Sequence, residues 1–457
     1  MEAKSGARYT SGGERLSVSF YAFGAILSYY MIMSFLQLFM TDIGIPAISV
    51  GLIFIVAKVW DAVNDPIFGV VVDKFSFKGG KYKPWLRIAS IAIPITTILL
   101  FIVPANISIQ VKILWSSVAY VLWDTAYTMY DVPLHSLYIA MTEDLNERNL
   151  LFSISSFSVY LGALVISIVV PILFPNIGWG ATGIIIGMLC FAFMQLLNFK
   201  CKERFVGAAN EESSIKDIIM SLIHNKYLLI FTLATIIGGI TNLGMSMNGY
   251  FAIHCLGGRQ WIMPLALASA VPVLFVVLFV PKILRRVDKF TATMIARGAM
   301  LLIDFTIFFS GYQNVTFFLV LIVVKNMFDA VWKITSIAFI ADCIEYAHFH
   351  TGERNQGIAF ATKAFTNKLV VALTGSVAMF GLAAFGFVEG TDVVQSRTTI
   401  DGIWFLYSFF PIIGNAICLG ILALFFKLRD KDIRVMVRCN NGEITRGEAE
   451  ANLSRKY

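Results

Sequence analysis

The sequence has few charged residues for its length. Only 14% of its 457 residues are Asp, Glu, Lys or Arg, whereas 58% are hydrophobic, and the mean hydropathy is +0.75. Because soluble globular domains carry about 25% charged residues, this composition excludes a soluble fold. The chain is predicted to be an integral membrane protein.

Motifs for nucleotide binding and covalent catalysis are also missing. The sequence has no phosphate-binding P-loop, no dinucleotide fingerprint, no zinc-ligand spacing and no nucleophile elbow. Its six cysteines form no CxxC pair, so neither a metal centre nor a disulfide framework is predicted. These absences argue against an enzyme, against a bound cofactor and against ATP as an energy source. An ion gradient is the expected source of energy for transport.

Long apolar runs recur along the whole chain. Each is continuous rather than alternating, and each approaches the roughly 20 residues that a helix needs to cross a bilayer. No cleavable signal is expected before the first run, which is too long for a signal peptide. The predicted spans are residues 17–41, 50–72, 86–104, 112–139, 151–174, 179–199, 227–254, 261–281, 292–311, 316–345, 358–387 and 402–426.

Basic residues gather in alternate connections between the spans. The connections opposite the N-terminus hold only Lys112, Arg259 and Arg397. By the positive-inside rule both termini are cytoplasmic, and we expect a multi-pass protein of the cell membrane. The net charge of +7 then reflects topology and contact with lipid headgroups rather than binding of nucleic acid.

One long polar connection divides the spans into two sets of six. We predict a six-helix bundle at 1–199, a cytoplasmic middle loop at 200–226, a second six-helix bundle at 227–426 and a cytoplasmic tail at 427–457. Twelve transmembrane helices in two pseudo-symmetric bundles are the frame for alternating access, in which one half rocks against the other. A static bundle with duplicated ancestry is the alternative.

The second span carries two carboxylates one helical turn apart, in the stretch WDAVNDPIFGVVVDKF. A charge at the centre of a span costs about 2.5–3.5 kcal/mol, so Asp61 and Asp65 need partners or a function. They share one helix face, and Asn64 lies close to it. Such an oxygen-rich set can bind Na⁺, and a proton can replace the metal ion. Alternatively, each aspartate pairs with a lysine such as Lys58 or caps a helix broken at Pro66.

The fourth span carries a row of aromatic, acidic and imidazole side chains. Its members recur every four residues and share one face: Trp123, Tyr127, Asp131 and His135. A carboxylate can accept hydrogen bonds from sugar hydroxyls while aromatic rings cover the CH faces of the sugar. The row is predicted to bind a substrate; an aromatic belt at the membrane interface is the alternative.

Charged residues in the second half predict an ion pair and a gate. Lys325 and Asp329 have opposite charges at i and i+4, which is typical of a structural pair. Asp342 and Glu345 lie near the cytoplasmic end of their span and are predicted to belong to a gate. Asp304 has no partner visible in the sequence.

Lys368 lies deep in the eleventh span, where an ammonium needs an anion. The candidates for that anion are Asp61, Asp65 and Asp131.

The stretches WDAVNDP, KGGKYKPW and DTAYTMYDVPLHSL resemble the glycoside-pentoside-hexuronide:cation symporter family of the major facilitator superfamily, in which melibiose permease is typical. The resemblance covers essentially all twelve spans and implies that superfamily's fold. It implies that Na⁺, Li⁺ or H⁺ binds at Asp61, Asn64, Asp65 and Thr128. It places sugar contacts at Trp123, Tyr127, Asp131 and Trp332. It makes Lys368 the link between the two sites, and Asp73 belongs to a superfamily loop feature for which we expect a coupling or gating role.

The sugar side departs from the family pattern at three positions. Tyr29 stands where an acidic residue is typical, Ser156 where an arginine is typical, and His135 where a tryptophan is typical. Lys333 and Lys363 add positive charge, so a hexuronide stays open beside a glucoside, a xyloside or a short oligosaccharide.

Together these features predict a monomeric secondary transporter that couples Na⁺ or H⁺ to the uptake of a sugar or glycoside. A Na⁺-coupled lysophospholipid carrier of the same superfamily branch is the second hypothesis. A non-transporting membrane sensor or a membrane enzyme is a remote third.

Overall fold

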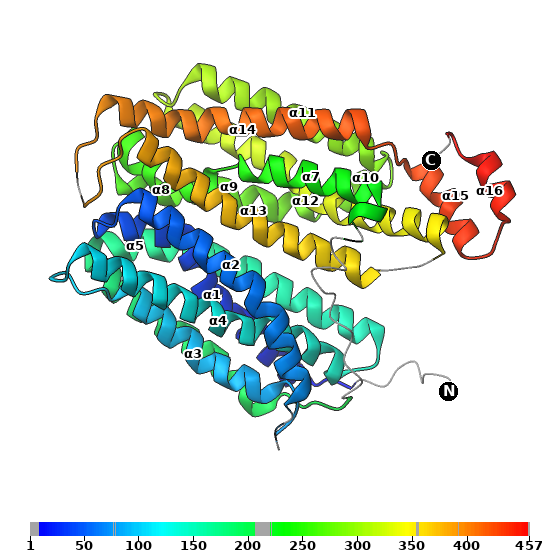
Figure 1. Ribbon diagram of the computed structural model, residues 1–457, viewed down its shortest axis with the longest axis horizontal. Helices are drawn as coiled ribbons and strands as arrows, with labels where there is room; N and C mark the ends of the chain where they lie inside the picture. Colours follow the sequence, from blue (N-terminus) through cyan, green and yellow to red (C-terminus); the bar gives the residue numbers. More distant parts are fainter. Residues whose placement is uncertain are drawn as a thin grey trace. The chain divides into compact units, whose positions relative to one another are not determined.

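The computed structural model describes residues 9–75, 77, 79–205, 220, 222–352, 356–391 and 393–455, without the side chains of residues 66, 73, 145, 198–200 and 356. The described chain is helical, with no strand beyond an isolated bridge between Phe77 and Gly80. This confirms the predicted all-α fold (Figure 1). The first half contains α1 (Gly12–Asp42), α2 (Ala47–Lys74), α3 (Lys83–Phe101), α4 (Ile109–Met141) and α5 (Leu145–Lys200).

The second half has more and shorter elements. A π-helical turn, η1, continues α8, and a 3-10 turn, η2, precedes α9. In chain order the elements are α7 (Lys226–Ile240), α8 (Gly244–Tyr250), η1 (Phe251–Cys255), η2 (Arg259–Trp261), α9 (Ile262–Val277), α10 (Val280–Leu284), α11 (Lys289–Ser310), α12 (Val315–Thr351), α13 (Gln356–Ala384), α14 (Arg397–Phe425), α15 (Asp430–Asn440) and α16 (Arg446–Asn452).

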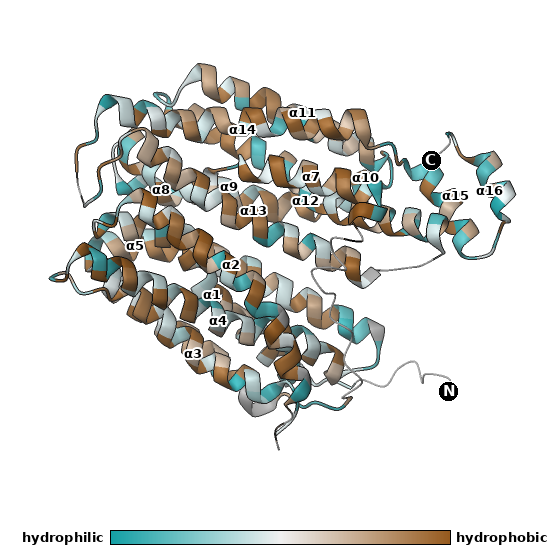
Figure 2. Ribbon diagram, viewed as in Figure 1, coloured by the Kyte–Doolittle hydropathy of each residue, from teal (hydrophilic) through white to brown (hydrophobic). Residues whose placement is uncertain are grey.

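Ten helical segments of the described chain are long and apolar enough to cross a membrane. The segment Asn146–Leu197 within α5 has 52 residues, about 78 Å of helix, and it is interrupted at Gly178 with φ 80° and ψ 166°. Because a bilayer core is about 30 Å thick, the two arms of α5 serve as two spans. With the 33-residue α4, the helices account for the twelve predicted spans. Figure 2 shows apolar residues along most of their length.

The chain divides into two compact units. The first comprises residues 1–212 and 382–396 and contains α1 to α5, and the second comprises residues 213–381 and 397–457. The predicted middle loop at 200–226 falls largely on residues 206–219, which lie outside the described part of the chain. The predicted domain boundaries therefore stay a prediction.

In the first unit, α1 packs closely along the second arm of α5. A Cβ atom at Gly24 would lie 2.9 Å from Met194 Cγ and 3.0 Å from the Cys190 carbonyl oxygen, so glycine lets the two helices approach. The buried Tyr21 hydroxyl donates to the Leu86 carbonyl at 2.7 Å, which ties α1 to α3. These contacts form a core on which α2 and α4 are positioned.

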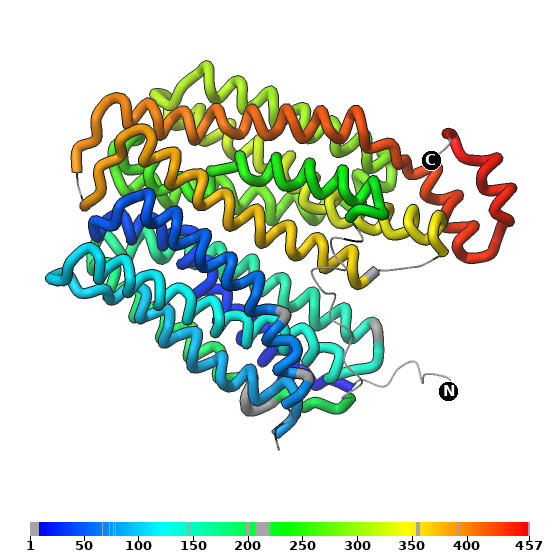
Figure 3. The backbone as a smooth tube through the Cα atoms, viewed as in Figure 1, coloured from blue at the N-terminus to red at the C-terminus, as the bar shows by residue number. Residues whose placement is uncertain are grey.

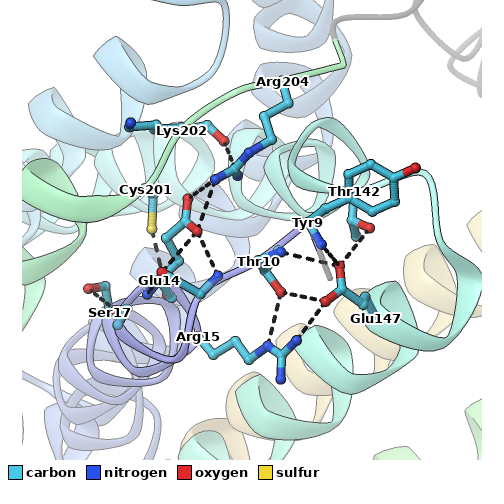
Figure 4. A network of polar contacts seen from close by, with 12 residues as sticks. Tyr9, Thr10, Glu14, Arg15, Ser17, Thr142, Glu147, Cys201, Lys202 and Arg204 are labelled. Carbon is cyan, nitrogen blue, oxygen red and sulfur yellow. Dashed lines mark hydrogen bonds and ion pairs between the residues drawn. The ribbon is translucent and has the colours of Figure 1, made fainter. Parts of the chain in front are cut away.

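One end of the first unit is held together by the buried carboxylate of Glu147, at the start of α5 (Figure 4). This carboxylate accepts hydrogen bonds from the backbone and hydroxyl of Thr10, from the backbone of Tyr9 and from the hydroxyl of Thr142, at 3.0–3.3 Å. Arg15 forms an ion pair with it at 2.6 Å. The segment before α1 is thereby fixed to α4 and α5.

The segment that follows α5 is fixed to the same end. Arg204 forms an ion pair with the buried Glu14 at 2.9 Å. The Glu203 carboxylate accepts from the backbone N–H groups of residues 81–83 at 2.6–2.9 Å and so caps α3. Burial raises the pKa of the Cys201 thiol to about 12, and this neutral thiol donates to the Glu14 carbonyl.

The C-terminal tail folds back onto the second unit as α15 and α16. Asp432 is fully buried and accepts from the backbone and hydroxyl of Ser454 at 2.8 and 2.6 Å. The Arg429 guanidinium lies 3.4 Å from the centre of the Phe290 ring. In Figure 3 the red C-terminal segment returns to the yellow end of α12. The tail is a docked part of the fold.

Removal of the Glu147 carboxylate is expected to destabilise the protein. In Glu147→Ala, Arg15 and two backbone donors lose their buried acceptor, which should lower the free energy of unfolding by about 2–4 kcal/mol. Thermal unfolding in detergent measures the change. Glu450→Ala, which breaks the exposed pair with Arg446, is the matched control and should leave the midpoint unchanged. Equal midpoints for the two variants would contradict the role of Glu147.

Candidate functional site

The helices α2 and α4 face each other along a polar seam. Its first layer, which we call the lysine layer, consists of Lys58 and Asp61 of α2 and Asp124 of α4. The Lys58 ammonium lies 2.9 Å from Asp124 Oδ1 and 3.4 Å from Asp61 Oδ2. The side chains of the three residues are 13%, 8% and 4% exposed, respectively. One buried ammonium therefore serves two buried carboxylates.

One helical turn further along is a second layer, which we call the threonine layer: Asn64, Asp65 and Thr128. The Asn64 amide donates to Thr128 Oγ1 at 2.9 Å, and Thr128 Oγ1 lies 3.0 Å from Asp65 Oδ1 and 3.2 Å from the Asp124 carbonyl oxygen. The single Thr128 proton can satisfy one of these two acceptors at a time. The layer brings a carboxylate and a hydroxyl oxygen next to a side-chain amide, chemical groups whose oxygen atoms suit a hard cation.

The four residues predicted to bind a cation all lie on this seam. Asn64, Asp65 and Thr128 meet in the threonine layer, whereas Asp61 lies in the lysine layer and pairs with Lys58. For Asp61, the alternative prediction of a lysine partner agrees with this ion pair. The sequence signal was the opposite charge at i and i+3 on α2, but Asp124 could not be recognised as the second partner.

An aromatic cluster lies next to the seam. The rings of Trp123 and Tyr127 are stacked with centroids 5.1 Å apart, and the Tyr29 ring of α1 lies 5.2 Å from Tyr127. The Trp123 indole is buried and donates to Ser28 Oγ at 2.8 Å, so its orientation is fixed. Tyr29, at the position where the family has an acidic residue, thus extends the aromatic surface. We call these three rings the aromatic shelf.

Asp131 and His135 continue the α4 row beyond the aromatic shelf. Their side chains are 46% and 58% exposed, and the nearest imidazole and carboxylate atoms lie 3.7 Å apart. His135 Nδ1 also lies 2.8 Å from the Asp131 carbonyl oxygen. The row therefore begins in rigidly packed rings and ends in accessible polar groups.

The second unit contains a buried polar chain across α11, α12 and α14. Asp304 pairs with Lys325 at 2.6 Å and accepts from the Asn415 amide at 2.6 Å. Arg297 donates to the Asn415 oxygen at 2.6 Å, and its guanidinium lies 4.0 Å from the centre of the Trp332 ring. Trp332, the aromatic residue implied by the family resemblance, is held by this chain.

The predicted pairing of Lys325 with Asp329 is wrong. Lys325 instead binds Asp304 on the neighbouring helix α11, and Asp329 binds Lys333 one turn further along α12 at 2.9 Å. Helical spacing brings an i,i+4 pair near each other, but burial decides the outcome. Asp304 is 2% exposed and has the greater need of a counter-ion.

The residues predicted to form a gate have partners at the end of α12. Asp342 is buried and pairs with Lys289 at 2.5 Å, and Lys289 also lies 3.4 Å from Asp430 of the tail. Glu345 accepts from the Asn440 amide at 3.0 Å. These contacts connect α12 with the start of α11 and with the tail, for which the sequence analysis predicted a cytoplasmic location but no helices.

The remaining residues of the predicted site are Lys368 and Asp73. Lys368 is half-buried on α13 in the second unit. Asp73 lies near the end of α2, but its side chain is outside the described part of the structure.

The fold and the paired carboxylates in apolar helices define a multi-pass membrane transporter rather than an enzyme. The sequence matches the family described as MFS/sugar transport protein over residues 17–430. The chain therefore belongs to this family, that of the glycoside-pentoside-hexuronide symporters.

Known proteins are similar over nearly the whole chain. An uncharacterised symporter of Bacillus subtilis, YjmB, is 30% identical over 432 residues, which cover 92% of this chain and 93% of the relative. The isoprimeverose transporter of Lactiplantibacillus pentosus is 26% identical, covering 91% and 88% of the two chains. The solved nucleoside transporter NupG is 14% identical with a TM-score of 0.66, covering 89% of this chain and 99% of NupG, which supports the fold.

Breaking the Lys325–Asp304 pair tests the buried chain of the second unit. Lys325→Met leaves Asp304 as an unpaired buried charge and is expected to reduce stability by about 3–5 kcal/mol. The double variant Lys325→Met/Asp304→Asn removes both charges and should recover part of that loss, which thermal unfolding in detergent can measure. A double variant no more stable than Lys325→Met would show that the pair is not the stabilising element.

Proposed function

We propose that this protein is a secondary active symporter that carries a sugar or glycoside together with Na⁺ or H⁺. The observation that carries the proposal is the polar seam, in which the buried carboxylates of Asp61 and Asp124 and the half-buried carboxylate of Asp65 lie with one ammonium between two apolar helices. Carboxylates at membrane depth are unfavourable unless a positive charge accompanies them. Asp61 and Asp124 share Lys58, and the Asp65 carboxylate lies one helical turn away beside Thr128. A cation that enters this group of carboxylates would be stabilised by them.

The threonine layer is the proposed cation site, with Asp61 as an additional ligand from the neighbouring layer. The Asp65 carboxylate and the Thr128 hydroxyl provide oxygen atoms 3.0 Å apart, and the Asn64 amide, which donates to Thr128 through its nitrogen here, would supply its oxygen after a rotation of the amide group. A Na⁺ ion would take the place of the Thr128 hydrogen bond to Asp65, with the Thr128 hydroxyl keeping its proton and turning it toward the Asp124 carbonyl oxygen, while a proton would neutralise the carboxylate directly. Na⁺ and H⁺ each bring one positive charge to Asp65, so the proposal includes either ion.

The aromatic shelf, with Asp131 and His135 beyond it, is the proposed substrate site of the first unit. The tilted rings of Tyr29 and Tyr127, 5.2 Å apart and backed by the buried Trp123, offer an apolar platform for a sugar ring, and the accessible Asp131 carboxylate can accept from sugar hydroxyls. Related proteins are named for isoprimeverose and for lactose, which supports a glycoside as the cargo. Trp332 and Lys368 are the proposed contributions of the second unit.

Transport would proceed by alternating access, with two six-helix bundles rocking around the bound ligands and both termini in the cytoplasm. The gate would involve Asp342 and Glu345, with Lys368 coupling the ion to the sugar. One charge that moves through 100 mV provides about 2.3 kcal/mol, enough for roughly fiftyfold accumulation of the sugar. No nucleotide is needed for such a cycle.

Ligand binding to the purified protein tests this function. A panel of glycosides, pentosides and uronides is measured with and without Na⁺ at two pH values. We expect at least one sugar to bind with an affinity that depends on Na⁺ or on pH. Binding of lysophospholipid without any sugar would overturn the sugar assignment and favour the lysophospholipid carrier.

Two substitutions on α4 locate the ion. Thr128→Val removes the hydroxyl between Asn64 and Asp65 and is expected to weaken the ion dependence of sugar binding at least tenfold. Thr125→Val is the matched control, because Thr125 accepts a hydrogen bond from Trp60 on the same helix pair but outside the two layers. If both variants retain the ion dependence of the native protein, the threonine layer is not the cation site.

A further inference from the structure

Lys58 is the positively charged residue of the two layers. Its ammonium has the same charge as the cation that is proposed to be transported. Its ammonium lies between two carboxylates and is closer to Asp124 at 2.9 Å than to Asp61 at 3.4 Å. The side chain has four rotatable methylene bonds, so small rotations can move the ammonium from one carboxylate to the other. The residue thus has two alternative partners within reach.

The neighbours of Lys58 include an aromatic ring of α4. The ammonium lies 5.9 Å from the centre of the buried Tyr120 ring on α4. Tyr120 and Tyr29 of α1 are the titratable neighbours on the helices packed against α2, in addition to the two carboxylates. Because phenols are neutral at physiological pH, Asp61 and Asp124 are the anions that the ammonium contacts here.

The two layers are adjacent on both helices. Asp61 and Asp65 lie one turn apart on α2, and Thr128 lies 3.2 Å from the carbonyl oxygen of Asp124 on α4. A cation that enters the threonine layer therefore approaches the lysine layer and repels the ammonium. Repulsion between like charges at such separations is strong where water is excluded.

We propose that Lys58 is a tethered counter-cation of the coupling site: it neutralises Asp61 when the transported ion is absent and withdraws to Asp124 when the ion binds. This proposal rests on the proposed cation-coupled function and adds a residue that determines ion affinity. Without the ion, the tethered charge neutralises Asp61, so that the empty carrier can return across the membrane. With the ion, Asp61 becomes available as an additional ligand.

Ion affinities of three variants test the proposal through changes of opposite sign. Lys58→Met removes the competitor and should tighten ion binding about tenfold, whereas Asp124→Asn removes the alternative partner, leaves Lys58 on Asp61 and should weaken binding about tenfold. The double variant should return to within about threefold of the native affinity. The measurement is ion-dependent thermal stabilisation of purified protein, titrated with Na⁺ at constant pH and with pH at constant Na⁺.

Transport measurements distinguish a Lys58 side chain that moves between two carboxylates from one that only contributes a fixed positive charge. In proteoliposomes, Lys58→Met should exchange internal for external sugar at near-native rates but accumulate at least tenfold less, because the empty carrier returns poorly. Trp60→Phe breaks the uncharged α2–α4 hydrogen bond with Thr125, and Lys325→Met/Asp304→Asn removes a buried lysine of the second unit together with its partner. Both controls should retain the ion affinity of the native protein.

The outcomes distinguish this proposal from the proposed function. If the native protein responds to the ion but Lys58→Met and Asp124→Asn both weaken ion binding, or neither changes it, the tether is refuted and the symporter stands. If the native protein shows no response to Na⁺ or pH, the symporter itself is wrong. Where Lys58→Met does not fold, recovery of affinity in the double variant relative to Asp124→Asn decides the question.

Discussion

Every charged side chain within an apolar bundle must be neutralised, and the arrangement of this protein follows from that constraint. In the first unit, Lys58 joins Asp61 and Asp124 across α2 and α4. In the second, Asp304 joins α11 to Lys325 of α12 and to Asn415 of α14. The helices are held in register by these polar contacts, since packing of apolar faces against lipid-like surroundings provides little specificity.

The two units use the same constraint in different ways. The pair at Asp304 has one charge of each sign and an amide that completes its hydrogen bonds, as a stabilising element requires. The seam at Asp61 gathers the carboxylates of Asp61, Asp65 and Asp124 near one lysine and one threonine. Carboxylates gathered at membrane depth are unfavourable in a static structure, and they become useful where a mobile cation enters and leaves.

The sequence predicted the helical fold and most of the residues on the seam, because long apolar runs and intramembrane carboxylates are strong local signals. It missed Asp124 as a partner of Lys58 and assigned Lys325 to Asp329, because pairing between helices depends on which faces meet and how deeply each group is buried. The tail helices α15 and α16 were also missed. Their stability depends on burial of Asp432 against Ser454 and on contact with α12, which short polar segments do not reveal.

The central claim is that sugar and cation cross together through this protein. The most direct measurement records cation flux in proteoliposomes when a sugar gradient is applied without any initial ion gradient. The account predicts that inward sugar movement drives Na⁺ or H⁺ inward at a constant ratio, and that Asp65→Asn abolishes this ion movement. Sugar entry at a native rate with no accompanying movement of either ion would contradict it.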